Sequence, residues 1–158
     1  MKSAKRSIIA ACATVLFGMA GMQQQADACT RFVYHGAGNE IFTGRSMDYK
    51  IDTGTHLWMF PRGMQRTGET GPDTLKWTSR YGSVIASAYD ISTTDGMNEA
   101  GLVANLLWLA ESEYPERTSG KPGLSISVWT QYMLDSFATG DEAVKALSSE
   151  AFTLVSDA

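Results

Sequence analysis

The sequence predicts an α+β protein, because strand-like segments fill the first part of the chain and helical spacing appears only after them. Between residues 30 and 109, short runs of β-branched, aromatic and aliphatic residues alternate with turns rich in Gly, Pro and Asn. From residue 125 the apolar residues recur every three or four positions, and residues 152–155 return to a strand pattern. We therefore expect about six strands, a pair of helices and the start of a further strand.

Residues 1–28 are typical of a secretory signal peptide. Three basic residues lie near the start, residues 8–22 are uncharged and mostly apolar, and Ala26-Asp27-Ala28 has the small-x-small pattern of a cleavage site. The apolar run is shorter than the roughly 20 residues that a membrane-spanning helix needs. We therefore predict that residues 1–28 are removed. The mature protein would be exported, periplasmic or secreted, with no membrane attachment after cleavage.

Cleavage after Ala28 would make Cys29 the first residue of the mature chain. The other cysteine, Cys12, leaves with the signal peptide, so no internal disulfide can form. The sequence therefore favours a free thiol that is used chemically. The alternative is a lipoprotein acylated at Cys29. Such sites usually carry Leu three residues before the Cys and a small neutral residue two before it, where this chain has Ala26 and Asp27.

The charge of the mature chain argues against nucleic acid and anionic membranes as partners. Of the 13 basic and 17 acidic residues, residues 29–158 keep 10 and 16, a formal net charge of −6. His35 and His56 have no metal-ligand spacing with the single Cys, so no metal is expected. Gly36-Ala37-Gly38 lacks a phosphate-binding context, and no cofactor is predicted.

The first elements of the mature chain form a predicted hairpin. Residues 30–35 and 40–45 are strand-like, and Gly36 to Asn39 supply the turn. Since the two strands rise about 3.3 Å per residue in opposite directions, their lengths nearly cancel. The hairpin would therefore bring Arg45 and Asp48 back to Cys29.

Apolar patterning predicts the remaining elements. These are a strand at 56–60 that stops at Pro61, an exposed loop at 64–73, a hairpin of 75–78 with 83–88, a turn at 97–101, a strand buried on both faces at 102–109, and an amphipathic helix at 125–138. Thr139 and Glu142 have the spacing of a capping box for a second helix, in which Val144 and Leu147 share one face.

An N-terminal Cys can supply both the nucleophile and the base of an amide hydrolase. The Cys29 thiol would attack the carbonyl, while its free α-amine, with an ordinary pKa of about 7.7–8.0, accepts the thiol proton. Arg45 would stabilise the thiolate, and Asp48 would hold the α-ammonium by a charge-assisted hydrogen bond. The alternative is that Arg45 and Asp48 form only a surface ion pair, worth less than about 1 kcal/mol.

Four short motifs of the mature chain are distinctive enough to indicate a protein family. They are Cys29-Thr30-Arg31-Phe32, Gly44-Arg45-Ser46-Met47-Asp48-Tyr49, Phe60-Pro61-Arg62-Gly63 and Asn98-Glu99-Ala100-Gly101-Leu102. Together they resemble the choloylglycine hydrolase family of conjugated bile salt hydrolases and penicillin V acylases. The resemblance implies an N-terminal-nucleophile hydrolase with an αββα sandwich, two antiparallel sheets between helices. The exported form is similar to the Gram-negative branch, for which penicillin V and acyl-homoserine lactones are the usual substrates.

The resemblance also implies roles for individual residues. Cys29 would be the nucleophile, with Arg45 supporting its thiolate and Asp48 binding its amine. Trp108 stands where bile salt hydrolases carry an Asn, which favours an aromatic acyl pocket over a steroid-binding one. We accordingly predict Tyr49 and Trp108 as substrate-binding residues, a small-molecule N-acyl amide as substrate, and a homo-oligomer, as in the family.

Members of this family are much longer than this chain and contribute an Asn and an Arg from their second half, beyond the position of Ala158. We therefore expect residues 29–158 to be the N-terminal part of the N-terminal-nucleophile domain, with an incomplete αββα sandwich. A non-catalytic exported protein or an inactive half-domain is the alternative to an active hydrolase.

Overall fold

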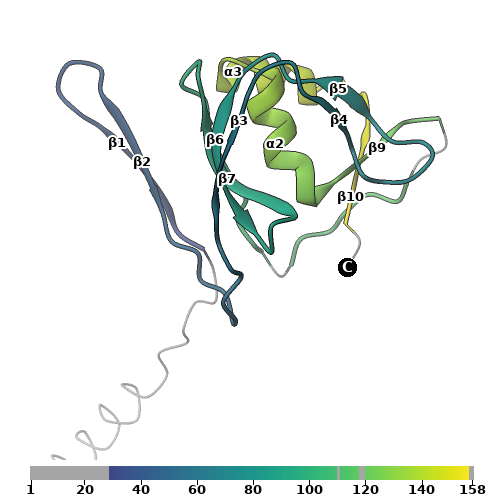
Figure 1. The fold of residues 1–158 in the computed structure, drawn as a ribbon, viewed down its shortest axis with the longest axis horizontal. Helices are drawn as coiled ribbons and strands as arrows, with labels where there is room; N and C mark the ends of the chain where they lie inside the picture. The colour runs from purple at the N-terminus through teal and green to yellow at the C-terminus, as the bar shows by residue number, and fades with distance from the viewer. Residues whose placement is uncertain (1–28, 110, 118–119, 157–158) are drawn as a thin grey trace, which may run out of the picture.

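The computed structural model of the protein describes residues 29–109, 111–117 and 120–156, which form ten strands and two helices (Figure 1). The predicted signal peptide, residues 1–28, lies outside the described residues. The strands make one four-stranded sheet and three two-stranded sheets. The predicted α+β class is confirmed, with the helices following most of the strands in the chain.

An antiparallel sheet with strand order β3-β6-β7-β8 forms the centre of the molecule. Its strands are β3 (Leu57–Phe60), β6 (Ser83–Ala88), β7 (Ser92–Asn98) and β8 (Val103–Asn105). The register of β6 against β7 shifts between Ala86 and Ser87, which marks a bulge. The chain leaves this central sheet after β3, makes a separate hairpin, and returns to it at β6.

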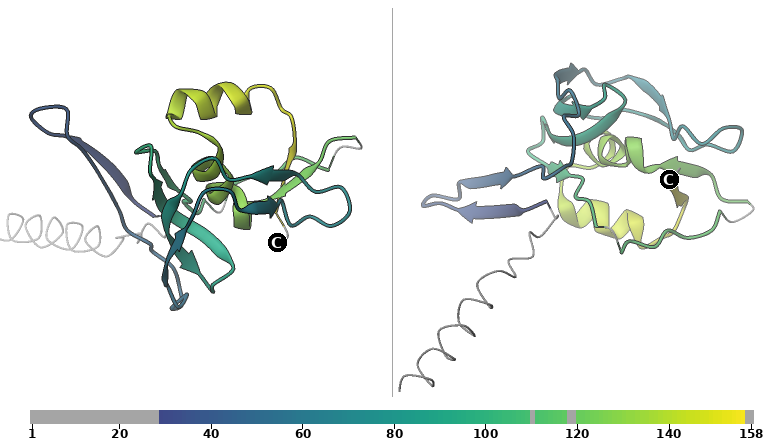
Figure 2. Two further views of the ribbon diagram at one scale, coloured as in Figure 1. Left: turned by 45° about the horizontal axis from the view of Figure 1, so that its top comes forward. Right: turned by 90° about the horizontal axis from the view of Figure 1, so that it is seen from below.

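Helix α2 (Ile126–Ser136) covers one face of the central sheet (Figures 1 and 2). The two elements approach closely at Gly96, where a Cβ atom would lie 2.6 Å from Cδ1 of Leu134. Leu134 and Ile85 are fully buried at this contact. Ser125 caps the helix by accepting a hydrogen bond from the Ser127 N–H. The helix predicted over 125–138 is therefore confirmed.

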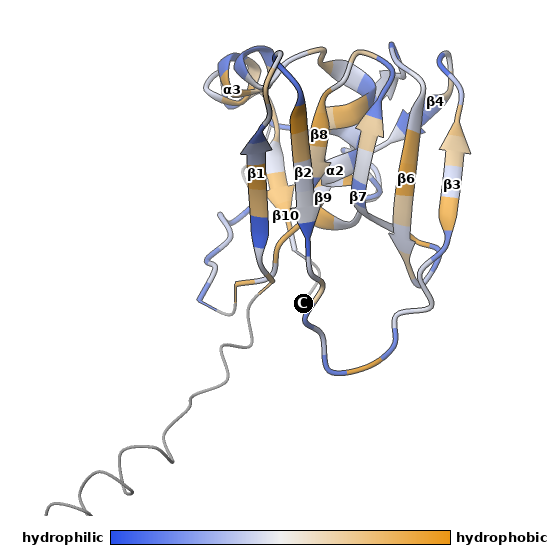
Figure 3. Ribbon diagram, turned by 90° about the vertical axis from the view of Figure 1, so that its left-hand side faces the viewer, coloured by the Kyte–Doolittle hydropathy of each residue, from blue (hydrophilic) through white to orange (hydrophobic). Residues whose placement is uncertain are grey.

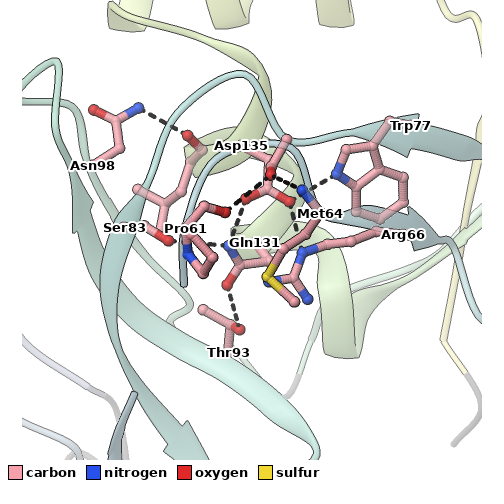
Figure 4. A network of polar contacts seen from close by, with 11 residues as sticks. Pro61, Met64, Arg66, Trp77, Ser83, Thr93, Asn98, Gln131 and Asp135 are labelled. Atoms are coloured by element: carbon pink, nitrogen blue, oxygen red, sulfur yellow. Dashed lines mark hydrogen bonds and ion pairs between the residues drawn. The ribbon is translucent and has the colours of Figure 1, made fainter. Parts of the chain in front are cut away.

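A buried polar network joins α2 to the strands (Figure 4). Nε2 of Gln131 donates to Ser83 Oγ at 3.2 Å and to Asp135 Oδ1 at 2.8 Å, and its Oε1 accepts from Thr93 Oγ1 at 3.0 Å. Oδ2 of Asp135 accepts from Nε1 of Trp77 at 2.8 Å. Gln131 and Asp135 are fully buried, so these bonds satisfy groups that burial would otherwise leave unpaired.

The opposite face of the central sheet is apolar and exposed in the described part of the chain (Figure 3). Leu57, Met59, Val84 and Met97 are 77%, 80%, 49% and 55% exposed. Met59 pairs with Val84, and Val84 pairs with Met97, so their side chains share the face that points away from α2. The N-terminal hairpin, β1–β2, stands on this side of the sheet (Figures 1 and 3).

Two small sheets and a second helix complete the described fold. β4 (Gln65–Thr67) pairs antiparallel with β5 (Lys76–Thr78), β9 (Gly123–Ser125) pairs parallel with β10 (Thr153–Val155), and α3 (Gly140–Leu147) lies between α2 and β10 in the sequence. Thr139 Oγ1 accepts from the Glu142 N–H at 3.2 Å, and the Glu142 carboxylate accepts from the Ala138 N–H at 2.9 Å. The capping box, the second helix and the strand near 152–155 are therefore confirmed.

The prediction of an exposed loop at 64–73 was wrong, because this segment contains β4. β4 pairs with β5, so residues 75–78 do not form a hairpin with 83–88, which pair with β3 and β7. The three residues of β4 include no aliphatic side chain. Backbone pairing and an ion pair from Arg66 to Asp135 hold this strand, and neither leaves a hydrophobic pattern in the sequence.

The strand predicted over 102–109 was wrong in its length and burial. β8 ends at Asn105, and Leu107, Trp108 and Leu109 are exposed. Its partner β7 was missed because its residues are mostly polar, and the predicted turn at 97–101 begins only after Asn98. The hydroxyls of Ser92 and Thr93 on β7 donate to α2, to the carbonyl of Ser127 and to Oε1 of Gln131, and that of Thr94 donates to the carbonyl of Ala86 on β6.

Neither helix among the described residues is long and apolar enough to cross a membrane.

Candidate active site

The predicted catalytic residues lie at the open end of the N-terminal hairpin, where Arg45 ends β2 and Cys29 and Asp48 flank the two strands. The hairpin consists of β1 (Arg31–His35) and β2 (Ile41–Arg45). Its register pairs Arg31 with Arg45 and Phe32 with Gly44, which confirms the predicted hairpin. A Cβ atom at position 44 would overlap the ring of Phe32, so the close approach of the ring requires Gly there. Arg45 therefore lies opposite Arg31, which is two residues after Cys29.

Ser46 links the end of β2 to the residue that follows Cys29. The Ser46 N–H donates to the carbonyl of Thr30 at 2.9 Å, and its Oγ accepts from the Thr30 N–H at 3.3 Å. The same hydroxyl donates to Oδ2 of Asp48 at 2.9 Å. Asp48 is thereby brought to the start of β1 through one hydroxyl group. Cys29, a free and half-buried thiol, directly precedes this point.

Arg45 extends from the hairpin to the central sheet. Its Nη1 lies 3.0 Å from Oδ2 of Asp95 on β7, and its Nη2 donates to the carbonyl of Leu106. Only 9% of the Arg45 side chain is exposed. Asp48 is bound by Ser46 instead, so the described side chains do not form the surface ion pair between Arg45 and Asp48 that the sequence left open.

Tyr49 and Trp108, the predicted substrate-binding residues, are about half exposed. Tyr49 neighbours Tyr89 in the turn between β6 and β7. Partial loss of water, with the adjacent Tyr49 hydroxyl, raises the pKa of Tyr89. Trp108 follows two residues after Leu106, whose carbonyl accepts from Arg45. Trp108 is therefore close in the chain to the Arg45 contact.

The third and fourth sequence motifs meet at the end of the central sheet and have structural roles. Nη2 of Arg62 lies 2.5 Å from Oε2 of Glu99, and Oε1 of Glu99 accepts from the Gly82 N–H at 2.8 Å. The hydrogen bond from Arg62 has the larger effect and that from the Gly82 N–H the smaller, and both lower the pKa of Glu99. Nδ2 of Asn98 donates to the carbonyl of Leu134 at 2.8 Å. These residues join the strands to each other and to α2.

No group of three or more His, Cys, Asp or Glu side chains in the described ranges could hold a metal ion. The residue after Cys29 is bonded to the Ser46 hydroxyl, which in turn donates to the Asp48 carboxylate, and Arg45 directly precedes Ser46 in the chain. These groups suit proton transfer and the stabilisation of an anion.

Three residues of this region were not predicted from the sequence as members of the candidate site. Ser46 stands inside a motif, but nothing in the sequence shows that it bridges Thr30 and Asp48. Asp95 and Asn105 are cross-strand neighbours on β7 and β8, and Nδ2 of Asn105 donates to Oδ1 of Asp95 at 2.8 Å. Their pairing depends on the register of β7, which apolar patterning does not reveal.

A sequence model of the linear amide C–N hydrolases, choloylglycine hydrolase family, matches residues 29–157. The chain belongs to this family. The family resemblance of the four motifs is therefore confirmed.

Solved and curated relatives agree with this assignment. A penicillin V acylase of Pectobacterium atrosepticum is 52% identical over 164 residues, which cover 98% of this chain and 44% of that protein. The structure of a penicillin V acylase from Agrobacterium tumefaciens is 63% identical, with a TM-score of 0.77 over 79% of this chain and 39% of that chain. A mutant conjugated bile acid hydrolase from Clostridium perfringens, 20% identical, has the same fold with a TM-score of 0.63 over 83% and 40% of the chains.

This choloylglycine hydrolase family chain spans less than half the length of the relatives that it matches. The N-terminal-nucleophile hydrolase fold predicted from the motifs is confirmed, and the described residues form part of it.

Proposed function

We propose that the protein is an exported amidohydrolase that uses Cys29 as its nucleophile once residues 1–28 have been removed. One observation carries this proposal. The Ser46 N–H bonds to the carbonyl of Thr30 at 2.9 Å, which brings the backbone between Arg45 and Asp48 beside the residue that follows Cys29. The family of linear amide C–N hydrolases supplies the reaction class.

The first half-reaction would form a thioester. The Cys29 α-amine takes the thiol proton, and the thiolate attacks the amide carbonyl carbon. Arg45 stabilises the thiolate, and Asp48, oriented by the Ser46 hydroxyl, holds the α-ammonium. The tetrahedral intermediate then collapses as its C–N bond breaks, and the α-ammonium gives its proton to the leaving amine.

The second half-reaction would release the acid. The Cys29 α-amine takes a proton from water while the water oxygen attacks the thioester carbonyl. The C–S bond breaks, the thiolate recovers the proton, and the carboxylic acid departs. Without cleavage after Ala28 there is no free α-amine, so the proposal makes removal of the signal peptide a condition for activity.

We propose penicillin V as the substrate to test first. Two relatives with high identity to this chain carry the name penicillin V acylase. The exposed indole of Trp108, close in the chain to the Arg45 contact, supports an aromatic acyl group such as phenoxyacetyl. Tyr49 is the second residue proposed to contact substrate. Acyl-homoserine lactones and conjugated bile salts are the comparison substrates.

The decisive experiment isolates the exported protein and determines the mass of its N-terminal peptide and its rate of penicillin V hydrolysis. We expect a free Cys29 that reacts with iodoacetamide, and loss of hydrolysis in Cys29→Ser. As a matched control, a variant that keeps Ala28 as its first residue retains the thiol but lacks the α-amine on Cys29. It should bind substrate and hydrolyse it at a greatly reduced rate.

Two results would overturn the proposal. A diacylglyceryl group on Cys29 would identify a lipoprotein with a blocked thiol. Unchanged hydrolysis by Cys29→Ser would show that another residue is the nucleophile.

A further inference from the structure

The Arg45 guanidinium is held by residues from another part of the fold. Its backbone belongs to β2, but Nη1 meets Asp95 of β7, 50 residues further along the chain, and Nη2 meets the carbonyl of Leu106. The Arg45 side chain is 9% exposed and that of Asp95 is 22% exposed. Partial burial of this kind reduces screening by water and makes the pair stronger than a fully exposed one.

Asp95 itself has a fixed position. It lies on an inner strand of the central sheet, between Ala86 on β6 and Asn105 on β8. Oδ1 of Asp95 accepts from Asn105 at 2.8 Å, which leaves Oδ2 for Arg45. The carboxylate is therefore oriented by its own sheet before Arg45 reaches it.

The second acceptor of Arg45 is equally constrained. The Leu106 N–H donates to the carbonyl of Thr94 at 2.7 Å, which extends the pairing of β7 and β8 past the end of β8. Both acceptors of the guanidinium thus belong to the same pair of strands. A planar guanidinium that is bound at two nitrogens has one orientation, and its long side chain loses its other rotamers.

The Nε of Arg45 is buried and has no hydrogen-bond partner among the described residues. If Asp95 were absent, the remaining partner of the guanidinium would be the neutral carbonyl of Leu106. One hydrogen bond to a carbonyl leaves a long cationic side chain free to turn toward water.

We propose that Asp95 is a positioning residue for the Cys29 site: it holds the Arg45 guanidinium in the place from which that cation stabilises the thiolate. Asn105 supports this function by orienting the Asp95 carboxylate. The inference rests on the roles proposed above for Cys29 and Arg45. Through Asp95, the central sheet would therefore influence the reactivity of the Cys29 thiol.

The test measures alkylation of Cys29 by iodoacetamide in the mature protein at pH 7 and at pH 10. In Asp95→Ala we expect the rate at pH 7 to fall about tenfold, because an opposite charge nearby ordinarily changes the thiol–thiolate balance by at least that factor. At pH 10 an ordinary cysteine is already mostly thiolate, so the rate should stay within about twofold of the wild type. A fall at both pH values would indicate blocked access and would overturn the proposal.

Two further variants separate positioning from a general structural effect. Asp95→Asn keeps an acceptor oxygen for Nη1, and we expect it to restore the pH 7 rate to at least the wild-type value. In an Arg45→Ala background, Asp95→Ala should cause no further fall, because there is no guanidinium left to position. Asp90→Asn, which changes a carboxylate paired with His56 in the turn between β6 and β7, is the matched control and should leave the rate unchanged.

The Asp95 proposal fails if Asp95→Ala alkylates like the wild type, or if its effect persists in full without Arg45. Should Asp95→Ala not fold, a pH 7 rate in Asp95→Asn below that of the wild type overturns it equally. These readouts require no substrate, so they are independent of the test by penicillin V hydrolysis. A protein that couples Asp95 to Cys29 reactivity but hydrolyses no amide would contradict the proposed function alone.

Discussion

Asp135 on α2 and Arg66 on β4 form an ion pair, with Oδ2 3.0 Å from Nε, although no part of the Asp135 side chain is exposed. Burial raises the pKa of Asp135, while hydrogen bonds from Trp77 and Gln131 and the charge of Arg66 act in the opposite direction. The guanidinium also lies over the ring of Phe60, 4.4 Å from its centroid. The β4–β5 hairpin is thereby fixed to the helix that covers the central sheet (Figure 4).

Replacement of Arg66 by Met should destabilise the fold by about 3 kcal/mol, because it leaves the buried Asp135 carboxylate without its counter-charge. Since the folded-state pKa of Asp135 is raised, the native state binds this proton more readily than the unfolded chain does, and loss of Arg66, which lowers the pKa, strengthens that effect. The stability associated with protonation is present below the ordinary pKa of Asp and is lost as the pH rises through the raised value. Urea unfolding should therefore show a larger deficit at pH 8 than at pH 4.

Arg80→Met is the matched control, because the Arg80 guanidinium donates to the exposed carbonyl of Ser136 and has no buried carboxylate to neutralise. It should cost less than about 1 kcal/mol. Equal, small losses for the two arginine variants would show that the Asp135 pair does not stabilise this fold.

Gly96→Ala should cost about 1–3 kcal/mol, the usual range for an overpacked core. The added Cβ would lie 2.6 Å from Leu134 Cδ1, 2.8 Å from Ile85 Cγ2 and 2.9 Å from the carbonyl oxygen of Val84. The Val84 atom is backbone in the adjacent strand, so rotation of side chains cannot relieve the contact. The free energy of unfolding in urea measures the effect.

Gly140→Ala provides the control for Gly96. No atom lies within 4 Å of a Cβ built at Gly140, and alanine is favoured over glycine in a helix. This variant should be as stable as the wild type or slightly more stable. Destabilisation of both variants would mean that backbone freedom, and not packing against α2, explains the loss at Gly96.

Local signals account for what the sequence predicts correctly. The β1–β2 hairpin has a turn of Gly and Asn residues, α2 has apolar spacing, and α3 has the Thr139 cap. β4 and β7 have no such signal, because their polar residues are held by partners such as Asp135 and Gln131 that lie far away in the sequence. The same limit applies to the site, where Arg45 is marked by a motif but its contact with Asp95 depends on strand register.

Glu99→Gln should make stability less sensitive to acid. The pKa of Glu99 is lowered by Arg62 and the Gly82 N–H, so the ionised form is favoured in the folded state. Its contribution is present above the ordinary Glu pKa of about 4.3 and is lost as the pH falls through the lowered value. The wild type should therefore lose more stability than the variant between pH 5 and pH 3 in urea unfolding.

Glu150→Gln tests whether this effect is specific to Glu99. Glu150 pairs with Lys121 at 3.3 Å, and its side chain is 80% exposed, so the pair is well screened. Its replacement should leave the acid dependence of stability close to that of the wild type. An identical change in both variants would assign the effect to net charge and not to the Arg62–Glu99 contact.

Ser46→Ala should lower the rate of amide hydrolysis about two- to tenfold, the range that corresponds to one ordinary hydrogen bond. The Ser46 hydroxyl donates to Asp48 at 2.9 Å and accepts from the Thr30 N–H, so its loss frees the carboxylate that is proposed to hold the α-ammonium. Hydrolysis of penicillin V by the mature protein measures the change, with circular dichroism to verify folding. Ser46→Thr keeps the hydroxyl and should retain most of the activity.

Ser148→Ala is the matched control, since its hydroxyl also forms a hydrogen bond, to the carbonyl of Val144 in α3, far from the hairpin in the sequence. Its activity should equal that of the wild type. If Ser46→Ala were fully active while Asp48→Asn was inactive, Asp48 would act without orientation by Ser46. The hydroxyl bridge would then serve only to close the end of the hairpin.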